Sequence, residues 1–315
     1  MKKILSFTTV LFPFILSAAQ AQPAAQAKSQ SITVRLQSDY TPALQKAADQ
    51  GNADAEAKVG FGYFRGKTLP HDYAKGIFWL QKAADQGHSD AETLLGNAYQ
   101  QGVGLPKNQE KAIFWYQKAA DQGNLDAQTL LGAAYHMGQG VPKNDQKAIF
   151  WLQKAADQAF PQAQNFLGEV YETGDPAVRN IEKAISWYQK AAEGNSVTAQ
   201  AHLGMAYHEG TKLPKNYEKS TFWFKKAALQ GDDQGQFFYG LACLKGEGVA
   251  KNPREAVSWF QKAADQGNLQ ATTRLGLAYA SGEGVPASKE KAVFWLKKAA
   301  GQGEPNAQRI LSMMR

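Results

Sequence analysis

Residues with the chemistry of a catalytic or metal site are scarce in this 315-residue sequence. Ser288 and Lys291 match the Ser-x-x-Lys spacing of the nucleophile and its lysine in penicillin-recognising enzymes. Cys243 is the one cysteine, and it could act as a nucleophile or as a redox thiol. A single cysteine excludes an intramolecular disulfide and a zinc site built from several thiolates. The five histidines leave little further material for a metal site or a catalytic triad.

The composition indicates a folded protein with mixed surface charge. Apolar residues make up 43% of the chain and charged residues 20%, so a packed core is available. The formal net charge is +7, from 35 Lys and Arg against 28 Asp and Glu. This balance is too mixed to indicate a nucleic-acid partner. Beyond the N-terminal apolar run, no stretch reaches the length of a membrane span.

The N-terminal residues follow the order of a secretory signal. Lys2 and Lys3 precede an almost wholly apolar run, and a triplet of small and polar residues that a signal peptidase recognises ends at Ala21. We therefore expect residues 1–21 to be a signal peptide and the protein to be exported, to the periplasm or as a secreted product. Residues 22–39 are rich in Gln, Ala and Ser, and we expect them to form a flexible lead-in.

A pattern of 36 residues repeats along the rest of the chain. The triplet Lys-Ala-Ala begins at Lys46, Lys82, Lys118, Lys154, Lys190, Lys226, Lys262 and Lys298. All seven tryptophans keep the same step, from Trp79 to Trp295, and so do two glycine columns and a tyrosine column. This regularity is typical of repeat proteins, in which units stack because one unit cannot bury its apolar face alone.

Each repeat contains two helical patterns. In the second repeat, apolar spacing up to Tyr99 predicts a first helix, and Gly102 predicts its left-handed end. Gly96 lies in the middle of that helix at a cost of about 1 kcal/mol relative to Ala, so we expect a close helix–helix approach that a side chain would block. Asn108 is placed to cap the second helix. The same slot holds Asp72, Asn144, Asn180, Asn216, Asn252 and Ser288.

The repeat also predicts the domain boundaries. Seven full repeats occupy residues 53–304. Residues 40–52 look like a lone second helix, and residues 305–315 look like a lone first helix. We expect these half repeats to cover the two open ends of an all-α solenoid, with Trp and Tyr filling the layers between helices.

The spacing resembles the Sel-1-like repeat family. It is Ala-x-x-x-Leu-Gly-x-x-Tyr-x-x-Gly, then Gly-Val, then Lys-Ala-x-x-Trp-x-x-Lys-Ala-Ala-x-x-Gly, and the stretch from Ala127 to Ala156 shows it well. The resemblance implies a right-handed superhelix of helix–turn–helix repeats, similar to tetratricopeptide repeats, and a role as a binding or adaptor scaffold. Ala159 and Asn195 depart from the terminal glycine, and Asp175-Pro176 departs from Gly-Val, so the fourth turn is expected to differ.

The repeat accounts for the residues with possible chemistry. Ser288 falls in the cap slot, Lys291 falls in a lysine column, and no Lys-Thr-Gly accompanies them. Cys243 falls in the tyrosine column, where a small buried residue is the simpler interpretation. We therefore expect no enzymatic activity, no catalytic residue, and neither a metal nor a cofactor. Because some exported relatives are linked to β-lactam binding or hydrolysis, the alternative is a cell-wall-active or β-lactam-binding repeat protein.

Two variable columns on the first helices are the candidate binding groove, by similarity to tetratricopeptide repeats. The candidate residues are Phe61, Phe64, Asn97, Gln100, His136, Glu169, Glu172, Met205, His208, Leu241 and Leu244. A polar middle flanked by apolar ends suits a protein or peptide segment of unknown identity. The histidines cannot share a metal with Glu172, because one repeat separates these residues by many times a ligand bond of about 2 Å.

A basic column lies in the loops between the two helices of each repeat. Its members are Lys107, Lys143, Arg179, Lys215 and Lys251. Stacked repeats would align them as a cationic ridge, which could attract an anionic cell-envelope glycan or an acidic protein. Binding at such a ridge should fall steeply with salt, whereas binding in the groove should not.

Overall fold

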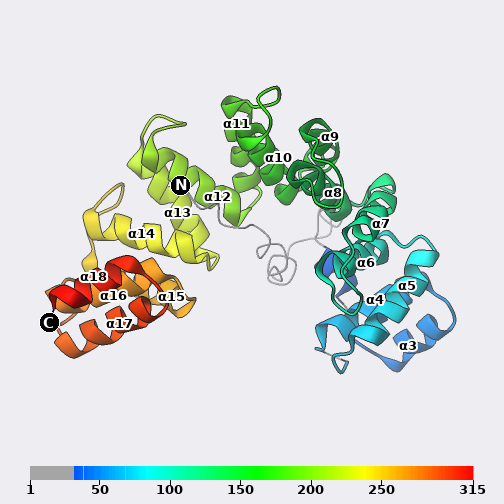
Figure 1. Cartoon of the computed structure of the whole chain (residues 1–315), viewed down its shortest axis with the longest axis horizontal. Helices are drawn as coiled ribbons and strands as arrows, with labels where there is room; N and C mark the ends of the chain where they lie inside the picture. Colours follow the sequence, from blue (N-terminus) through cyan, green and yellow to red (C-terminus); the bar gives the residue numbers. More distant parts are fainter. Residues whose placement is uncertain (1–31, 38, 68, 315) are drawn as a thin grey trace. The chain divides into compact units, whose positions relative to one another are not determined.

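The chain is helical throughout the part that the structure describes. This computed structural model describes residues 32–37, 39–67 and 69–314, and within these ranges it holds helices and no strand. The described residues group into two compact units, one up to Asn180 and one from Ile181 onward (Figure 1). The predicted signal peptide, residues 1–21, lies outside the described residues.

The helices of the first unit are α2 (Ile32–Leu36), α3 (Pro42–Asp49), α4 (Ala53–Arg65), α5 (Tyr73–Asp85), α6 (Ser89–Gln101), α7 (Gln109–Asp121), α8 (Leu125–Met137), α9 (Asp145–Ala156) and α10 (Pro161–Thr173). Those of the second unit are α11 (Ile181–Glu193), α12 (Val197–Glu209), α13 (Tyr217–Leu229), α14 (Asp233–Lys245), α15 (Pro253–Asp265), α16 (Leu269–Ser281), α17 (Lys289–Gly301) and α18 (Pro305–Met313).

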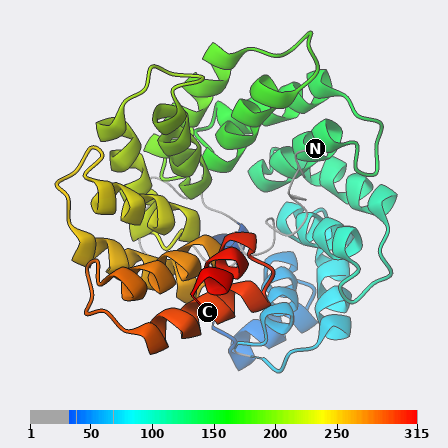
Figure 2. The same ribbon diagram turned by 60° about the vertical axis from the view of Figure 1, so that its left-hand side comes forward.

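Helices pack as consecutive antiparallel neighbours. In the first unit the strongest pairs are α4 with α5, α6 with α7 and α8 with α9; in the second unit they are α12 with α13, α14 with α15 and α16 with α17. Each pair also packs on the next pair within its unit, as Figure 2 shows. The fold is therefore the predicted α-solenoid of helix–turn–helix repeats. Within the described residues, no helix is long and apolar enough to cross a membrane.

The predicted caps begin and end these helices. The Asn108 side chain accepts a hydrogen bond from the Lys111 amide at 2.9 Å, which satisfies one of the free N–H groups at the start of α7. The side chains of Asp72, Asn144, Asn216, Asn252 and Ser288 accept the equivalent bond. Gly102 ends α6 with φ 76° in the left-handed region. The short polar and glycine residues of the repeat thus fix where its helices start and stop.

The mid-helix glycine is in close contact with its partner helix, as predicted. A Cβ placed on Gly132, Gly204, Gly240 or Gly276 would lie 2.5–2.7 Å from a side-chain atom of the second helix. The atom belongs each time to the residue after the tryptophan, for example Leu152 or Phe260. These residues are buried to 3% exposure or less in all seven repeats: Leu80, Tyr116, Leu152, Tyr188, Phe224, Phe260 and Leu296.

The tryptophans therefore differ from the expectation that they fill the layers between helices. Trp115 and Trp151 are buried, and the other five are half-buried. A lysine three residues on covers the exposed side of the ring, with Lys118 Nζ 4.7 Å from the Trp115 centroid and Lys262 Nζ 3.9 Å from that of Trp259. The residue after each tryptophan is the one that fills the centre of the helix pair.

The departures in the repeat have local structural consequences. Ala159 and Asn195 replace glycine and take positive φ values of 58° and 64°. Gly174 ends α10 with φ −64° and ψ −177°, where other first helices end in the left-handed region. The fourth turn differs as predicted, and its loop continues through Asp175-Pro176.

The two half repeats form single helices, α3 before the first full repeat and α18 after the last. Thr41 caps α3 by accepting a hydrogen bond from Leu44 N at 3.1 Å, and Ala48 of α3 packs against Val59 of α4. At the other end, Ala307 of α18 packs against Leu296 and Ala299 of α17. Each half repeat covers apolar surface that the neighbouring pair would otherwise expose.

The expected flexible lead-in, residues 22–39, contains a helix where it is described. Residues 32–36 form α2, and Ile32 and Leu36 are only 0% and 2% exposed. The physical reason is that these two side chains find apolar partners in the first unit, which repays the entropy lost on ordering the segment.

Candidate binding surfaces

In the first unit, α2 covers a surface that has both apolar and acidic side chains. Ile32 and Leu36 belong to one apolar cluster with Phe61 of α4, Leu95 of α6 and Trp115 of α7. We call the surface formed by Phe61, Asp90, Leu95, Trp115 and Asp126 the α2 face. Of the candidate groove residues, Phe61 belongs to it, and Phe64 packs at its edge.

Two aspartates of the α2 face hold Arg35. The guanidinium lies against Asp90, with Nη2 2.5 Å from Oδ1 and Nε 2.9 Å from Oδ2, and Nη2 is 2.9 Å from Asp126 Oδ2. The Ile32 amide donates to the same Asp126 oxygen at 3.2 Å. Burial alone would lower the pKa of Arg35, but the hydrogen bond with Asp90 and the charges of both aspartates raise it above its ordinary value.

The carboxylates of this site are positioned by the repeat. Asp90 and Asp126 stand at the second residue of α6 and α8, so the 36-residue step places them side by side in adjacent repeats. Asn124, the cap of α8, donates to Asp90 Oδ1 at 2.6 Å and fixes the first carboxylate. Burial raises the pKa of Asp126, and the charge of Arg35 opposes that shift.

The polar groove candidates of the second repeat are turned toward a core tyrosine. The Tyr116 hydroxyl lies 2.7 Å from Asn97 Oδ1 and 3.0 Å from Gln100 Oε1. Burial raises the pKa of Tyr116 well above its usual range. Asn97 is buried, so its amide satisfies the tyrosine and is not an open ligand. Gln100 is half-buried and also reaches Gln139 Oε1 at 3.4 Å.

His136 belongs to a polar cluster at the fourth turn. Its Nδ1 lies 2.5 Å from Asp145 Oδ1, and its Nε2 lies 3.3 Å from the Thr173 hydroxyl. Asp145 Oδ2 accepts the amide of Asp175 at 2.7 Å and lies 3.3 Å from Lys143 Nζ. Burial alone would raise the pKa of Asp145, but the bonds from His136 and the Asp175 amide, with the Lys143 charge, lower it.

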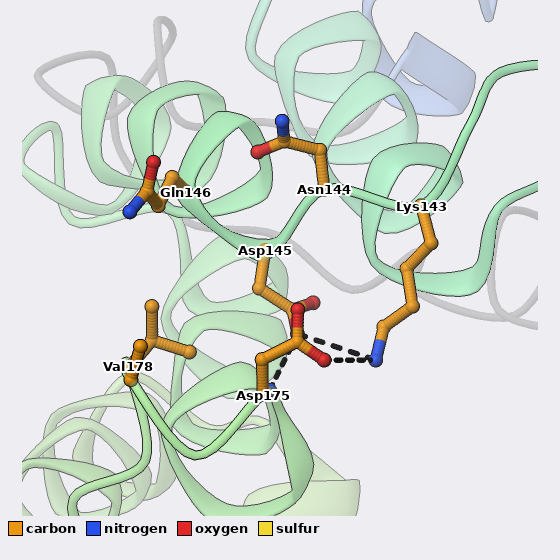
Figure 3. Close-up of a pocket in the computed structure, with 7 residues that line it drawn as sticks. Lys143, Asn144, Asp145, Gln146, Asp175 and Val178 are labelled. Atoms are coloured by element: carbon orange, nitrogen blue, oxygen red, sulfur yellow. Dashed lines mark hydrogen bonds and ion pairs between the residues drawn. The ribbon is translucent and has the colours of Figure 1, made fainter.

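A small pocket of about 210 Å³ opens beside this cluster (Figure 3). Its lining residues are Lys143, Asn144, Asp145, Gln146, Asp175, Ala177 and Val178. In Figure 3 the Lys143 ammonium points at the carboxylates of Asp145 and Asp175, which it meets at 3.3 and 2.9 Å. The charged groups that face the pocket therefore satisfy one another, and their contacts attach the irregular fourth loop to α9.

The remaining groove candidates of the first unit are Glu169 and Glu172 of α10. Both are half-buried. Burial raises the pKa of Glu169, opposed by the charge of His136 and assisted by that of Glu172.

In the second unit the candidates are mainly apolar. Met205, Leu241 and Leu244 are half-buried and pack on the cluster around Phe260. His208 lies edge-on to Tyr217, with ring centroids 5.6 Å apart. The structure brings these four residues to neighbouring parts of α12 and α14, where packing explains all of them.

The basic loop residues are exposed, but carboxylates and carbonyls lie among them. Besides the contacts of Lys143, Lys251 meets Glu283 at 3.9 Å, and Arg179 Nη2 donates to the Gly174 carbonyl at 3.0 Å. Lys215 Nζ lies 4.8 Å from the centroid of the Tyr217 ring. Lys107, the first member of the column, is exposed like the others. Carboxylates beside Lys143 and Lys251 reduce the positive charge that these two residues present to a polyanion.

Residues with possible chemistry have structural roles. Ser288 Oγ accepts the Lys291 amide at 3.3 Å as the cap of α17. Cys243 is buried, and burial raises the pKa of its thiol. Among the described residues, no group of three His, Cys, Asp or Glu side chains has the geometry to hold a metal ion.

Sequence reasoning missed two features. One is the Asp90–Asp126 pair, whose signal is an aspartate that recurs one repeat apart. The other is an exposed phenylalanine before the tryptophan in five repeats: Phe78, Phe114, Phe150, Phe222 and Phe294. In the first unit, Phe78, Phe114 and Phe150 lie edge-on to the following indole at 5.0–5.2 Å and are 53–57% exposed. The Phe-Trp dipeptide in every such repeat was the available signal.

The repeat unit matches a family model along most of the chain. The model of the Sel1 repeat matches residues 44–52, 53–88, 89–124, 125–160, 161–196, 197–232, 233–268 and 269–304. The chain belongs to the Sel1 repeat family.

Two solved structures are similar to this Sel1 repeat protein. A protective antigen of uropathogenic Escherichia coli strains, which displays an SLR fold, is 34% identical with a TM-score of 0.73; the match covers 86% of this chain and 58% of that chain. A Sel1 repeat protein from Oxalobacter formigenes is 31% identical with a TM-score of 0.63, over 78% of this chain and 96% of that one. This chain thus spans little more than half the length of the E. coli antigen. No curated protein matches it.

Proposed function

We propose that this Sel1 repeat protein is a non-enzymatic scaffold outside the cytoplasm that holds a protein or peptide segment on the first helices of its repeats. The repeat fold is generally a protein–protein interaction scaffold. One observation of this chain supports a peptide ligand in particular: the α2 face holds a five-residue helix by two buried aliphatic side chains and a paired arginine. A surface that orders so short a segment has the features of a peptide-recognition site.

We place the rest of the binding surface beyond the α2 face, on α8 and α10. Glu169 and Glu172 offer negative charge there, next to the His136 cluster. We expect the variant Glu169→Lys with Glu172→Lys to lose most partner capture when the full chain is used as bait on the envelope proteins of its source organism. The matched control is Glu110→Lys with Glu218→Lys, which makes the same charge change at two exposed helix positions. Equal capture by both variants, with unchanged helicity, would place the ligand elsewhere.

Export is the second part of the proposal. It is supported by the order of basic, apolar and small residues in residues 1–21. Mass spectrometry of the protein recovered from its source organism tests it. A mature chain that begins at Gln22 in an envelope or culture fraction is the expected result, and an intact Met1 in the cytoplasmic fraction contradicts it.

The alternative of β-lactam binding or hydrolysis gains no support from the geometry. A nucleophilic serine needs a base that can take its proton, whereas Ser288 Oγ accepts a backbone amide at a helix start. A turnover assay on the purified chain with a chromogenic β-lactam distinguishes the two functions. Anionic glycan binding is tested by retention on a polyanion column at low and physiological salt.

A further inference from the structure

The α2 face has an apolar part and an acidic part that contact the same short segment. An apolar part takes Ile32 and Leu36, whose side chains are almost fully buried. An acidic part takes the Arg35 guanidinium, and Asp126 also accepts the backbone N–H of Ile32. The polar contacts come from residues 55 to 94 positions away in the sequence, so they are tertiary contacts of a segment that lies outside the repeats.

The acidic part is shaped for a guanidinium. Asp90 meets Nε and Nη2 of Arg35 side-on, at 2.9 Å from Oδ2 and 2.5 Å from Oδ1, which is the bidentate geometry of arginine and carboxylate. A lysine ammonium is a single point charge and could not make both contacts with the same alignment. Asn124 Nδ2 donates to the same Asp90 Oδ1 at 2.6 Å and so helps to hold the carboxylate in place. The position of the Asp90 carboxylate is therefore fixed by the N-cap of α8 as well as by Arg35.

The face would be unfavourable if nothing occupied it. Asp90 and Asp126 both lie within 3 Å of Arg35 Nη2, so without a cation these two neighbouring carboxylates would repel each other. The apolar surface that Ile32 and Leu36 cover would at the same time be exposed to water. Such a face needs an occupant that brings positive charge and aliphatic side chains together.

We propose that the α2 face is the recognition site for a partner protein segment that carries an arginine between aliphatic residues, and that residues 32–36 occupy it as an internal substitute. This inference rests on the proposed scaffold function and names the partner chemistry for it. A partner binds by displacing α2, so the protein's affinity for such a segment is reduced by the fraction of molecules in which α2 is bound.

The test uses the full chain and a fluorescent peptide. The peptide is N-acetylated Ile-Thr-Val-Arg-Leu-Gln, the sequence of residues 32–37, so that the first amide can still donate. The variant Ile32→Asp with Arg35→Glu places two negative charges against the aspartates and should release α2. We expect this released variant to bind the peptide at least about tenfold more tightly than the wild-type chain, because the internal competitor is removed.

Further substitutions in the released variant identify the contacts. Asp126→Asn or Asp90→Asn should weaken peptide binding about tenfold to a hundredfold, the range for losing a charged hydrogen bond in a buried pair. A peptide with lysine in place of arginine should bind more weakly for the same reason. The matched control is Asp54→Asn, which stands in the same column one repeat earlier but pairs with Lys58 at the surface, and it should leave binding unchanged.

Four results would overturn the proposal. The first is that the released variant shows no saturable binding at about 1 mM peptide, and the second is that Asp90→Asn and Asp126→Asn leave binding unchanged. The third is that the arginine and lysine peptides bind equally well. The fourth is that the wild-type chain forms a dimer in which residues 32–36 of a second copy occupy the α2 face. Circular dichroism of each variant separates these from a loss of fold. If envelope partners are still captured when both aspartates are replaced, the scaffold function holds and this inference fails.

Discussion

At the scale of the residue, the repeat tolerates exceptions only where backbone geometry allows them. Gly123 ends one repeat in the left-handed region with φ 86°, and the equivalent position one repeat later is Ala159 with φ 58°. A Cβ disfavours this region by roughly 1 kcal/mol. The hydrogen bond from the Ala159 amide to Ala156 O, at 3.0 Å, closes the turn and offsets this steric cost.

Ala159→Gly should therefore stabilise the protein by about 1 kcal/mol, since it removes the steric cost without removing a contact. The free energy of unfolding, measured by urea titration, checks this. The reverse change at the equivalent position, Gly123→Ala, should destabilise by a similar amount, because the added Cβ meets open space and only the backbone conformation opposes it. A neutral result for both variants would show that φ does not limit stability at this turn.

Asp145 predicts a pH dependence. Its pKa in the folded protein lies below the ordinary value of about 4, so the unfolded chain binds the proton more readily. The stabilisation that this carboxylate gives is therefore complete above about pH 4 and disappears as the pH falls through the folded pKa. Asp145→Asn should cost about 1–3 kcal/mol at pH 7 and progressively less below pH 4.

Chemical unfolding of Asp145→Asn and the wild-type chain from pH 3 to 7 measures this difference. Asp121→Asn is the control, because Asp121 is exposed and accepts only the side-chain amide of Gln117 at 3.0 Å. Its effect should stay within about 0.5 kcal/mol at every pH. A constant difference for Asp145→Asn across the pH range would contradict the role of its charge.

At the scale of the element, the close contact between the two helices of a repeat depends on a missing side chain. Gly240 of α14 lies against the Phe260 ring of α15, and a Cβ there would be 2.7 Å from a ring carbon. Alanine is the better helix former by about 1 kcal/mol, so helix propensity alone favours the substitution. Packing opposes it, because an aromatic ring with 1% exposure has no room to move.

Gly240→Ala should destabilise the protein by about 1–3 kcal/mol, the usual cost of overpacking a core. Gly301 offers a matched comparison, since it is the last residue of α17 and a Cβ there meets nothing within 4 Å. Gly301→Ala should stabilise or leave stability unchanged. Thermal unfolding followed by circular dichroism decides between packing and propensity: equal shifts for the two variants would rule out the packing explanation.

At the scale of the whole molecule, the parts that follow the 36-residue period could be predicted from the sequence. The cap at Asn108, the left-handed end at Gly102 and the close approach at Gly96 are local consequences of residue type, and the structure confirms each. The burial of Trp115 could not be predicted in the same way. The tryptophan column and the column after it are both apolar, and periodicity alone does not say which of the two lies at the centre of the helix pair.

Contacts outside the period could not be predicted. Arg35 reaches Asp90 and Asp126 from a segment that belongs to no repeat, and no spacing rule relates residue 35 to residue 126. The columns of Asn97 and Gln100 change residue type between repeats, as the columns of binding residues do. In this repeat, however, both side chains form hydrogen bonds with Tyr116 of the same repeat. Variation in a column indicates a change of neighbour, and that neighbour can be internal.

The reactivity of the Cys243 thiol can be used to measure local opening of the second unit. The thiol is the chain's single one, and it is buried between α14 and its neighbours, so a thiol reagent can react only when that part of the second unit opens. Labelling under native conditions should therefore be slow and should accelerate in Gly240→Ala by the factor that its loss of stability predicts. Labelling at the rate of a free thiol would show instead that this layer opens without unfolding.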